Sequence, residues 1–123
     1  MEVVAVLGAS SDSERYSYKA IEMLMDYGHR PIPIHPKENE ILGFKVVHSI
    51  NELIHSGEKI DTLTMYVNPK ISSTLKDDIL KLSPKRVIFN PGSENFELAN
   101  SLEKHGIHVE NACTLVMLRT SQF

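Results

Sequence analysis

The sequence has little that would tie the protein to an extracellular, membrane or nucleic-acid setting. It has one cysteine, Cys113, so no disulfide can form within the chain. It has no apolar run of about 20 residues that could cross a bilayer, and its first residues lack the pattern of a secretion signal. It has no excess of positive charge: 13 Lys and Arg stand against 16 Asp and Glu, a net charge of −3. Because nucleic acids and anionic membranes attract positive charge, we expect a cytoplasmic protein that binds neither.

The sequence also lacks the motifs of several enzyme classes. Gly8 is followed by no further glycine at the spacing of the dinucleotide fingerprint G-x-G-x-x-G, and there is no P-loop, Ser–His–Asp order or metal-ligand cluster. His29, His55 and His105 fall near expected helix ends, where a cation suits the helix dipole. Cys113 has small or apolar neighbours, which favour a buried structural cysteine over a nucleophile. These absences favour a binding protein without catalytic activity of its own.

What the sequence does contain is an alternation of apolar strands and amphipathic helices. With 123 residues and 41% hydrophobic content, the chain has the size and core of one domain, residues 1–123. We expect strands over residues 3–7, 31–35, 45–47, 62–67, 86–89 and 107–109. We expect helices over residues 16–27, 50–55, 69–82 and 93–105. Such alternation predicts a doubly wound, mainly parallel, Rossmann-like α/β domain, because parallel neighbours need helical crossovers.

Local signals support two of the helix starts. Ser49 and Glu52 have the Ser-x-x-Glu spacing of a capping box. Asn68 can cap the following helix, and Pro69 fits its first position. We expect that helix to place a row of apolar residues on one face: Ile71, Leu75, Ile79 and Leu82.

Four loops should meet where a ligand binds in such sheets, beyond the carboxyl ends of the strands. They cover residues 8–17, 35–37, 67–69 and 90–93. Three of them lead into helices, whose free amides and positive dipole ends favour phosphate. The first loop carries or adjoins hydroxyls and cations that suit a pyrophosphate: Ser10, Ser11, Arg15, Ser17 and Lys19. Its spacing alone fits a simple polar loop with a helix cap equally well.

The second loop distinguishes nucleotide classes. An NAD site would have Asp or Glu at the end of the second strand to accept the ribose hydroxyls, whereas this chain has His35-Pro36-Lys37. A lysine there suits an additional phosphate, as in NADP or in coenzyme A with its 3′-phosphate. The alternative is a solvated surface lysine, the commoner situation for a single Lys.

Several segments together resemble the small stand-alone CoA-binding domain proteins, whose fold is shared with the CoA-binding domain of succinyl-CoA synthetase α subunits. The resemblance covers essentially the whole chain. Its segments are Val4–Ser10, Ser17–Lys19, Ile32–Lys37, Tyr66–Pro69, Val87–Ser93 and Gly106–Cys113.

The resemblance implies a role for each loop in binding coenzyme A or an acyl-CoA. The CoA phosphates would be held by Gly8, Ala9, Ser10, Arg15, Ser17 and Lys19. The adenosine and its 3′-phosphate would lie along His35, Pro36 and Lys37. The adenine or the start of the pantetheine arm would be flanked by Val67, Asn68 and Pro69, and the ligand's other side would face Asn90 and Gly92.

Three functions therefore remain open. The first is a CoA or acyl-CoA binding protein that acts as a carrier, a regulator or a donor to an unidentified protein partner. Its 123 residues leave no room for the second domain of a ligase. The second is an NADP-binding, oxidoreductase-like protein, and the third is an interaction module with a vestigial nucleotide site.

Overall fold

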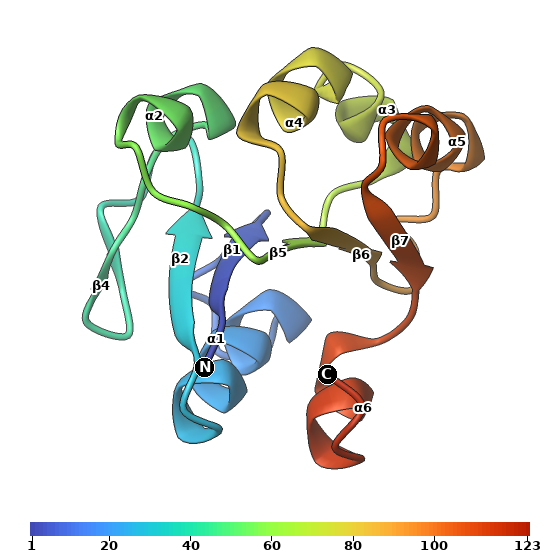
Figure 1. Ribbon diagram of the computed structural model, residues 1–123. Coiled ribbons are helices and arrows are strands. Elements are labelled where there is room, and N and C mark those ends of the chain that lie inside the picture. The colour runs from blue at the N-terminus through green and yellow to red at the C-terminus, as the bar shows by residue number, and fades with distance from the viewer.

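The computed structural model describes residues 1–123, and a five-stranded parallel sheet forms its centre (Figure 1). The strands are β1 (Val3–Leu7), β2 (Arg30–Ile34), β5 (Thr62–Met65), β6 (Arg86–Phe89) and β7 (His108–Asn111). Their order across the sheet is β2-β1-β5-β6-β7, and every pair is parallel. The predicted doubly wound α/β class is confirmed.

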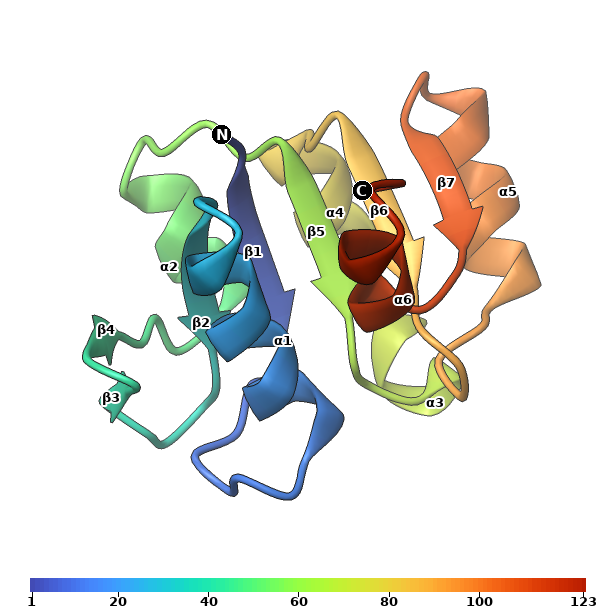
Figure 2. The ribbon, with the colours of Figure 1, turned by 90° about the horizontal axis from the view of Figure 1, so that it is seen from below.

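Helices cover both faces of this sheet (Figures 1 and 2). One face carries α1 (Tyr16–Asp26) and α6 (Thr114–Arg119), which contact each other. The opposite side carries α2 (Ile50–His55), α3 (Pro69–Ser72), α4 (Lys76–Leu82) and α5 (Phe96–Lys104). No helix is both long and apolar enough to cross a membrane.

The side-chain alternation of β1 divides the core into two layers. Val4 and Val6 pack in a cluster with Ile21 and Leu24 of α1, while Ala5 and Leu7 belong to the larger cluster on the opposite face. Because both faces of β1 are covered, the strand is a continuous apolar run, as predicted.

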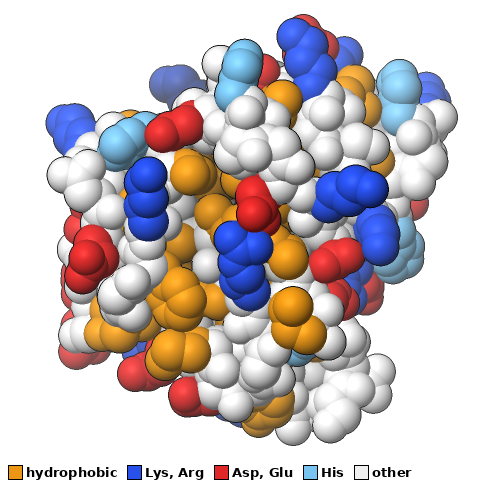
Figure 3. All heavy atoms as spheres, turned by 60° about the vertical axis from the view of Figure 1, so that its left-hand side comes forward, with side chains coloured by type: hydrophobic (Ala, Val, Ile, Leu, Met, Phe, Trp, Pro, Cys, Tyr) orange, Lys and Arg blue, Asp and Glu red, His pale blue; other side chains and the backbone are white.

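The β2 edge of the sheet is protected by proline and by a small hairpin. Arg30 donates its amide hydrogen to Glu2 on the β1 side, so the missing N–H groups of Pro31 and Pro33 fall on the outer side. The hairpin of β3 (Glu40–Ile41) and β4 (Phe44–Lys45) lies beyond this edge. Figure 3 shows apolar side chains in a hollow on this face, with charged groups around them.

One predicted helix is wrong, because the segment from Pro69 to Leu82 forms two helices. Both the amide and the hydroxyl of Thr74 donate to the Ile71 carbonyl, and the Leu75 amide donates to Ser72. These three-residue hydrogen bonds tighten the chain and turn it between α3 and α4. Ile71 therefore lies 48% exposed and off the expected apolar face.

Other predicted boundaries shift for local reasons. Residues 45–47 do not form a sheet strand: Lys45 ends the hairpin, and Val47 makes a single bridge to Ile34. The helix expected from Ser93 begins only at Phe96, because Asn95 accepts the Leu98 amide at 3.1 Å and caps it.

Three further boundaries differ from the prediction. The expected strand 31–35 is β2, residues 30–34; the expected strand 62–67 ends at Met65; and the expected strand 107–109 is β7, residues 108–111. Helix α6 was not predicted, because its six residues are too few for a clear amphipathic period.

The two predicted caps are present. Ser49 accepts the Glu52 amide at 3.0 Å, and Asn68 accepts the Ile71 amide at 3.0 Å. The Glu52 carboxylate accepts from the His48 amide, one residue before the cap, so the box is shifted from its usual reciprocal form.

Candidate functional site

The carboxyl ends of β1 and β5 lie side by side. Here the strand order changes direction, because β2 is added on one side of β1 and β5 on the other. After β1 the chain enters α1 on one face, and after β5 it enters α3 on the other (Figure 2). A crevice at such a point is the usual ligand site of an open α/β sheet. Gly8 has φ of +83°, and a Cβ there would lie 2.8 Å from the Tyr66 carbonyl oxygen. Glycine is therefore required for the two strand ends to approach this closely.

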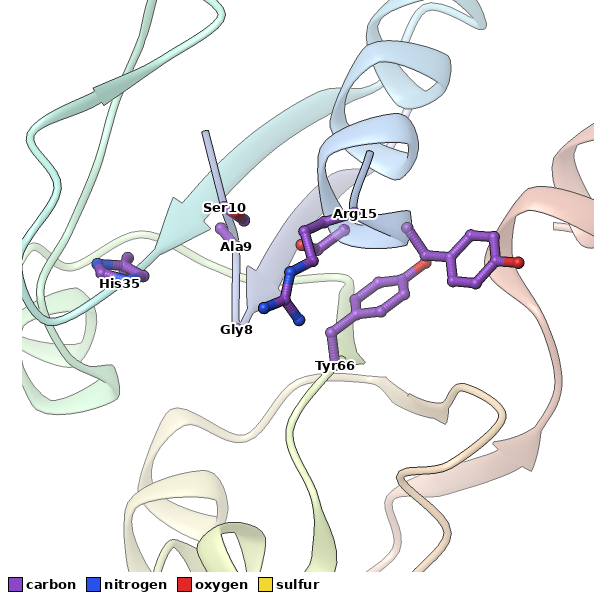
Figure 4. Close-up of a pocket in the computed structure, with 8 residues that line it drawn as sticks. Gly8, Ala9, Ser10, Arg15, His35 and Tyr66 are labelled. Atoms are coloured by element: carbon purple, nitrogen blue, oxygen red, sulfur yellow. The ribbon is translucent and has the colours of Figure 1, made fainter. Parts of the chain in front are cut away.

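A cavity of about 420 Å³ opens at this point, which we name the phosphate cavity. Its lining residues are Gly8, Ala9, Ser10, Arg15, Tyr16, Ser17, His35 and Tyr66. Figure 4 shows His35 on one side of the Gly8–Ser10 segment, with Arg15 and Tyr66 on the other. The structure thus brings together six of the predicted site residues from two loops.

The amino end of α1 opens into the phosphate cavity without a cap. Arg15 stands at the cap position and makes no side-chain capping bond, and the first turn carries no acidic residue. The amides of Tyr16, Ser17 and Tyr18 have no hydrogen-bond acceptor within the protein. In contrast, α2, α3 and α5 are each capped by a side chain. Three free amides, the positive end of an 11-residue helix and a guanidinium together favour a bound phosphate.

The loop that precedes α1 is ordered by its own hydrogen bonds. The Asp12 amide donates to the Ser10 hydroxyl oxygen at 3.0 Å, and the Arg15 amide donates to the Asp12 carbonyl at 3.0 Å. The Ser11 amide donates to the Glu38 carboxylate at 3.0 Å, which ties this loop to the loop after β2. The Ser10 hydroxyl proton remains free to donate to a ligand.

The loop after β2 places its three predicted residues differently. His35 lines the cavity, and its Nδ1 atom accepts the amides of Lys37 and Glu38, each at 3.0 Å. Nδ1 therefore serves as the hydrogen-bond acceptor for this loop, which leaves Nε2 as the ring nitrogen without a partner in the loop. Pro36 and Lys37 are exposed and lie outside the cavity lining.

Two further cavities continue from the phosphate cavity along the same edge, and Tyr66 lines all three. The first, which we name the α6 cavity, measures about 400 Å³. Its lining residues are Tyr16, Lys19, Tyr66, Asn90, Pro91, Cys113, Leu115, Val116 and Arg119. The second, the Asn68 cavity, measures about 250 Å³ and is lined by Tyr66, Val67, Asn68, Pro91, Gly92 and Ser93.

Five of the remaining predicted residues line these two cavities, and several of them maintain the fold. Lys19 and Asn90 line the α6 cavity, and Val67, Asn68 and Gly92 line the Asn68 cavity, whereas Pro36, Lys37 and Pro69 line none of the three. Asn90 is buried, donates from Nδ2 to Thr64 and Met65 at 2.7 and 2.9 Å, and accepts the Thr114 amide at 2.9 Å. Its amide group is thus used to hold β5, β6 and α6 together. The Asn68 side chain caps α3, and Pro69 occupies the first turn of that helix outside any cavity lining.

Sequence reasoning missed part of the site. Tyr16 and Tyr66 had no polar pattern to mark them, although Tyr66 lies at the centre of the three cavities. Leu115, Val116 and Arg119 belong to the unpredicted helix α6. The expectation that Cys113 is buried is wrong, because its side chain is half-buried and lines the α6 cavity.

The charge of the three cavity linings is opposite to that of the whole chain. None of the residues lining the three cavities is acidic, while Arg15, Lys19 and Arg119 supply positive charge. The Lys19 ammonium lies 5.7 Å from the Tyr16 ring centroid, and none of the three cations forms a salt bridge. Burial raises the pKa of the Tyr66 phenol, so it stays neutral at every physiological pH. The edge is therefore suited to an anionic ligand.

Similar solved structures agree with this fold. A crystal structure described as an uncharacterized protein is 40% identical, with a TM-score of 0.90 over 100% of this chain and 98% of the other. The structure of cell-free ID.343 from Thermus thermophilus is 27% identical, with a TM-score of 0.88 over 99% of this chain and 90% of the other.

A larger enzyme contains the same fold as one part. The dinucleotide-forming acetyl-coenzyme A synthetase 1 of Ca. Korarchaeum cryptofilum, in complex with phosphate and ADP, is 22% identical with a TM-score of 0.74. The match covers 90% of this chain and 25% of that enzyme. The model of the CoA binding domain family matches residues 2–119, nearly the whole chain. This protein therefore belongs to the CoA binding domain family.

Proposed function

We propose that the protein binds coenzyme A or an acyl-CoA along the carboxyl edge of its sheet, without catalytic activity of its own. The observation that carries this proposal is the uncapped amino end of α1, which opens into a cavity with Ser10, Arg15 and Ser17 and no acidic residue. The pyrophosphate accepts hydrogen bonds from the free amides of α1 and from the guanidinium of Arg15. The adenosine extends toward His35, and the pantetheine arm extends toward Tyr66.

The family and one structural neighbour support the choice of ligand. The chain belongs to a family of CoA binding domains, and the synthetase that shares its fold is an acetyl-CoA enzyme. The output we propose is carriage or delivery of the ligand to a protein partner in the cytoplasm. The single, half-buried Cys113 suits that reducing setting.

Calorimetric titration with CoA, 3′-dephospho-CoA, NADP and NAD tests the ligand class. We expect CoA to bind most tightly, and the Arg15→Ala variant to lose about tenfold in CoA affinity, because a charged hydrogen-bond donor to phosphate is removed. Lys81→Ala is the matched control, because Lys81 is an exposed cation in the last turn of α4. The CoA affinity of this variant should be unchanged. Tighter binding of NADP than of CoA would favour the oxidoreductase-like alternative. No binding of any nucleotide would favour the interaction module.

A separate titration tests whether Lys37 contacts the ligand, because this residue lies outside the lining of the phosphate cavity. We propose that its exposed ammonium meets the 3′-phosphate of CoA when the ligand is bound. Lys37→Ala should then weaken CoA about fivefold and leave 3′-dephospho-CoA unchanged, since only CoA carries that phosphate. An equal loss for both ligands would place Lys37 elsewhere.

A further inference from the structure

The α6 cavity differs in character from the two cavities beside it. Its lining contains two tyrosine rings, Pro91, Leu115 and Val116, so apolar surface predominates. The two tyrosines also line the phosphate cavity, whose other residues are small or carry a hydroxyl, a guanidinium or an imidazole. The Asn68 cavity has no leucine and no second aromatic ring beside Tyr66. The α6 cavity is therefore the part of this edge where apolar ligand surface would be buried most favourably.

Two apolar side chains of this cavity are left uncovered by the protein. Val116 is 50% exposed on α6, and Tyr16 is 68% exposed at the start of α1. The two helices contact each other on one face of the sheet, and side chains of both line the cavity. The burial of such exposed apolar surface by a bound molecule lowers the free energy of the complex.

The cavity is continuous with the proposed phosphate site. Tyr16 and Tyr66 line both, so a ligand whose phosphates lie at the amino end of α1 reaches the α6 cavity by passing Tyr66. His35 lies on the far side of the Gly8–Ser10 segment, which leaves this direction for the arm that carries the thiol (Figure 4). The Asn68 cavity is smaller, at about 250 Å³ against about 400 Å³.

We infer that the α6 cavity is an acyl subsite that receives the thiol end of the pantetheine arm together with its acyl chain, and that the preferred ligand is a CoA thioester with an apolar acyl chain rather than free CoA. This inference rests on the proposed CoA binding and specifies the ligand class at the same site. The acyl chain packs between Val116 and Leu115 of α6 and the rings of Tyr16 and Tyr66. The long side chains of Lys19 and Arg119 cover its edges with their apolar stems.

Calorimetric titration of the whole protein with CoA, hexanoyl-CoA and glutaryl-CoA tests this inference. Because each buried methylene strengthens binding about threefold to fourfold, we expect hexanoyl-CoA to bind at least tenfold more tightly than CoA. Glutaryl-CoA, whose chain ends in a carboxylate, should bind no more tightly than hexanoyl-CoA. A preference for glutaryl-CoA that disappears in Arg119→Ala would overturn the apolar assignment.

A cavity-filling variant localises the effect. Val116→Trp places a large ring in the α6 cavity, so we expect the ratio of hexanoyl-CoA affinity to CoA affinity to fall from at least about tenfold to about one. Met25→Trp is the matched control, because Met25 is a 42% exposed apolar residue of α1 outside the cavity lining, and it should keep the preference. Loss of the preference for hexanoyl-CoA in both variants would contradict the location of the acyl chain in the α6 cavity. A thermal unfolding curve for each variant confirms that it is folded.

The two proposals fail in different ways. If none of the three CoA compounds binds, the proposed function itself is wrong. If CoA binds and hexanoyl-CoA binds no more tightly, only the acyl subsite is wrong. A preference for hexanoyl-CoA that survives Val116→Trp would place the acyl chain in another cavity.

Discussion

Both ends of the parallel sheet carry arginine side chains. The arginine at the amino end is paired with acidic residues, and those at the carboxyl end are not. At the amino end, Arg86 is 14% exposed and contacts Glu2, Glu110 and Thr62, and its guanidinium lies 4.5 Å from the Phe123 ring centroid. At the carboxyl end, Arg15, Lys19 and Arg119 line cavities and have no acidic partner.

The net charge of this chain therefore says little about where an anion binds. The chain carries −3 overall, yet Glu2 and Asp61, which precede β1 and β5, and Glu110 of β7 are paired with Arg86 or Lys85. The carboxyl end keeps uncompensated donors: three cations and the free amides of α1. The first arrangement stabilises the fold, and the second is available to a ligand.

The strongest destabilisation should come from the close contact between Gly8 and Tyr66 at the carboxyl end. Gly8→Ala should lower the free energy of unfolding by about 3 kcal/mol, because the new Cβ meets the Tyr66 carbonyl at 2.8 Å and φ is +83°. Gly28→Ala is the matched control: its φ is also +83°, but nothing lies within 4 Å of the new Cβ, so we expect about 1 kcal/mol. Denaturant unfolding measures both. Equal losses would mean that only the backbone conformation matters at Gly8.

The next effect compares one arginine from each end. Arg86→Ala should lower the free energy of unfolding by about 2 kcal/mol, since it leaves Glu2 and Glu110 half-buried without their shared partner, and should leave CoA affinity unchanged. Arg15→Ala should change stability by less than about 0.5 kcal/mol, because Arg15 is exposed and forms no salt bridge, while it weakens CoA. Urea unfolding and calorimetry on both variants check this. A stability loss at Arg15 as large as that at Arg86 would remove the contrast between the two ends.

The smallest effect is pH-dependent and lies at the amino end. The Val3 amide donates to the Asp61 carboxylate at 2.8 Å and, with a smaller contribution from Lys85, holds the pKa of Asp61 below its ordinary value of 3.8. A lowered pKa stabilises the folded state while the carboxylate is charged in both states, and this stability is lost as the pH falls through the folded-state pKa.

Asp61→Asn should therefore cost up to about 1 kcal/mol at pH 7, and the difference from the natural protein should narrow below about pH 4. Urea unfolding across that range measures it, with Asp26→Asn at the exposed end of α1 as control. A difference that stays constant with pH would show that the charge of Asp61 contributes nothing.

The sequence predicted most of the fold because its signals are local. The buried run of β1, the caps at Ser49 and Asn68 and the alternation of strands with helices are each contained within a few residues. The signals failed where short-range hydrogen bonds competed with a periodic pattern, as at Thr74, or where an element was too short to show a period, as in α6.

The site was predicted in part. The loops after β1 and β2 contributed Ser10, Arg15, Ser17 and His35, because polar loops at strand ends are visible in a sequence. The place of Tyr66 in the cavity lining was not predicted, because a tyrosine among apolar residues is typical of a buried core position. The bonded role of Asn90 was also missed, because it joins residues 24 to 26 positions away.

The class of fold and the loops that meet at the carboxyl edge follow from the sequence, as does the lack of a second glycine after Gly8. The division of this edge into a phosphate cavity and an apolar α6 cavity follows only from the packing of the folded chain. The physical reason is that a cavity is the space left between elements packed from distant parts of the chain. In this protein α1 and α6, about 100 residues apart, enclose it together.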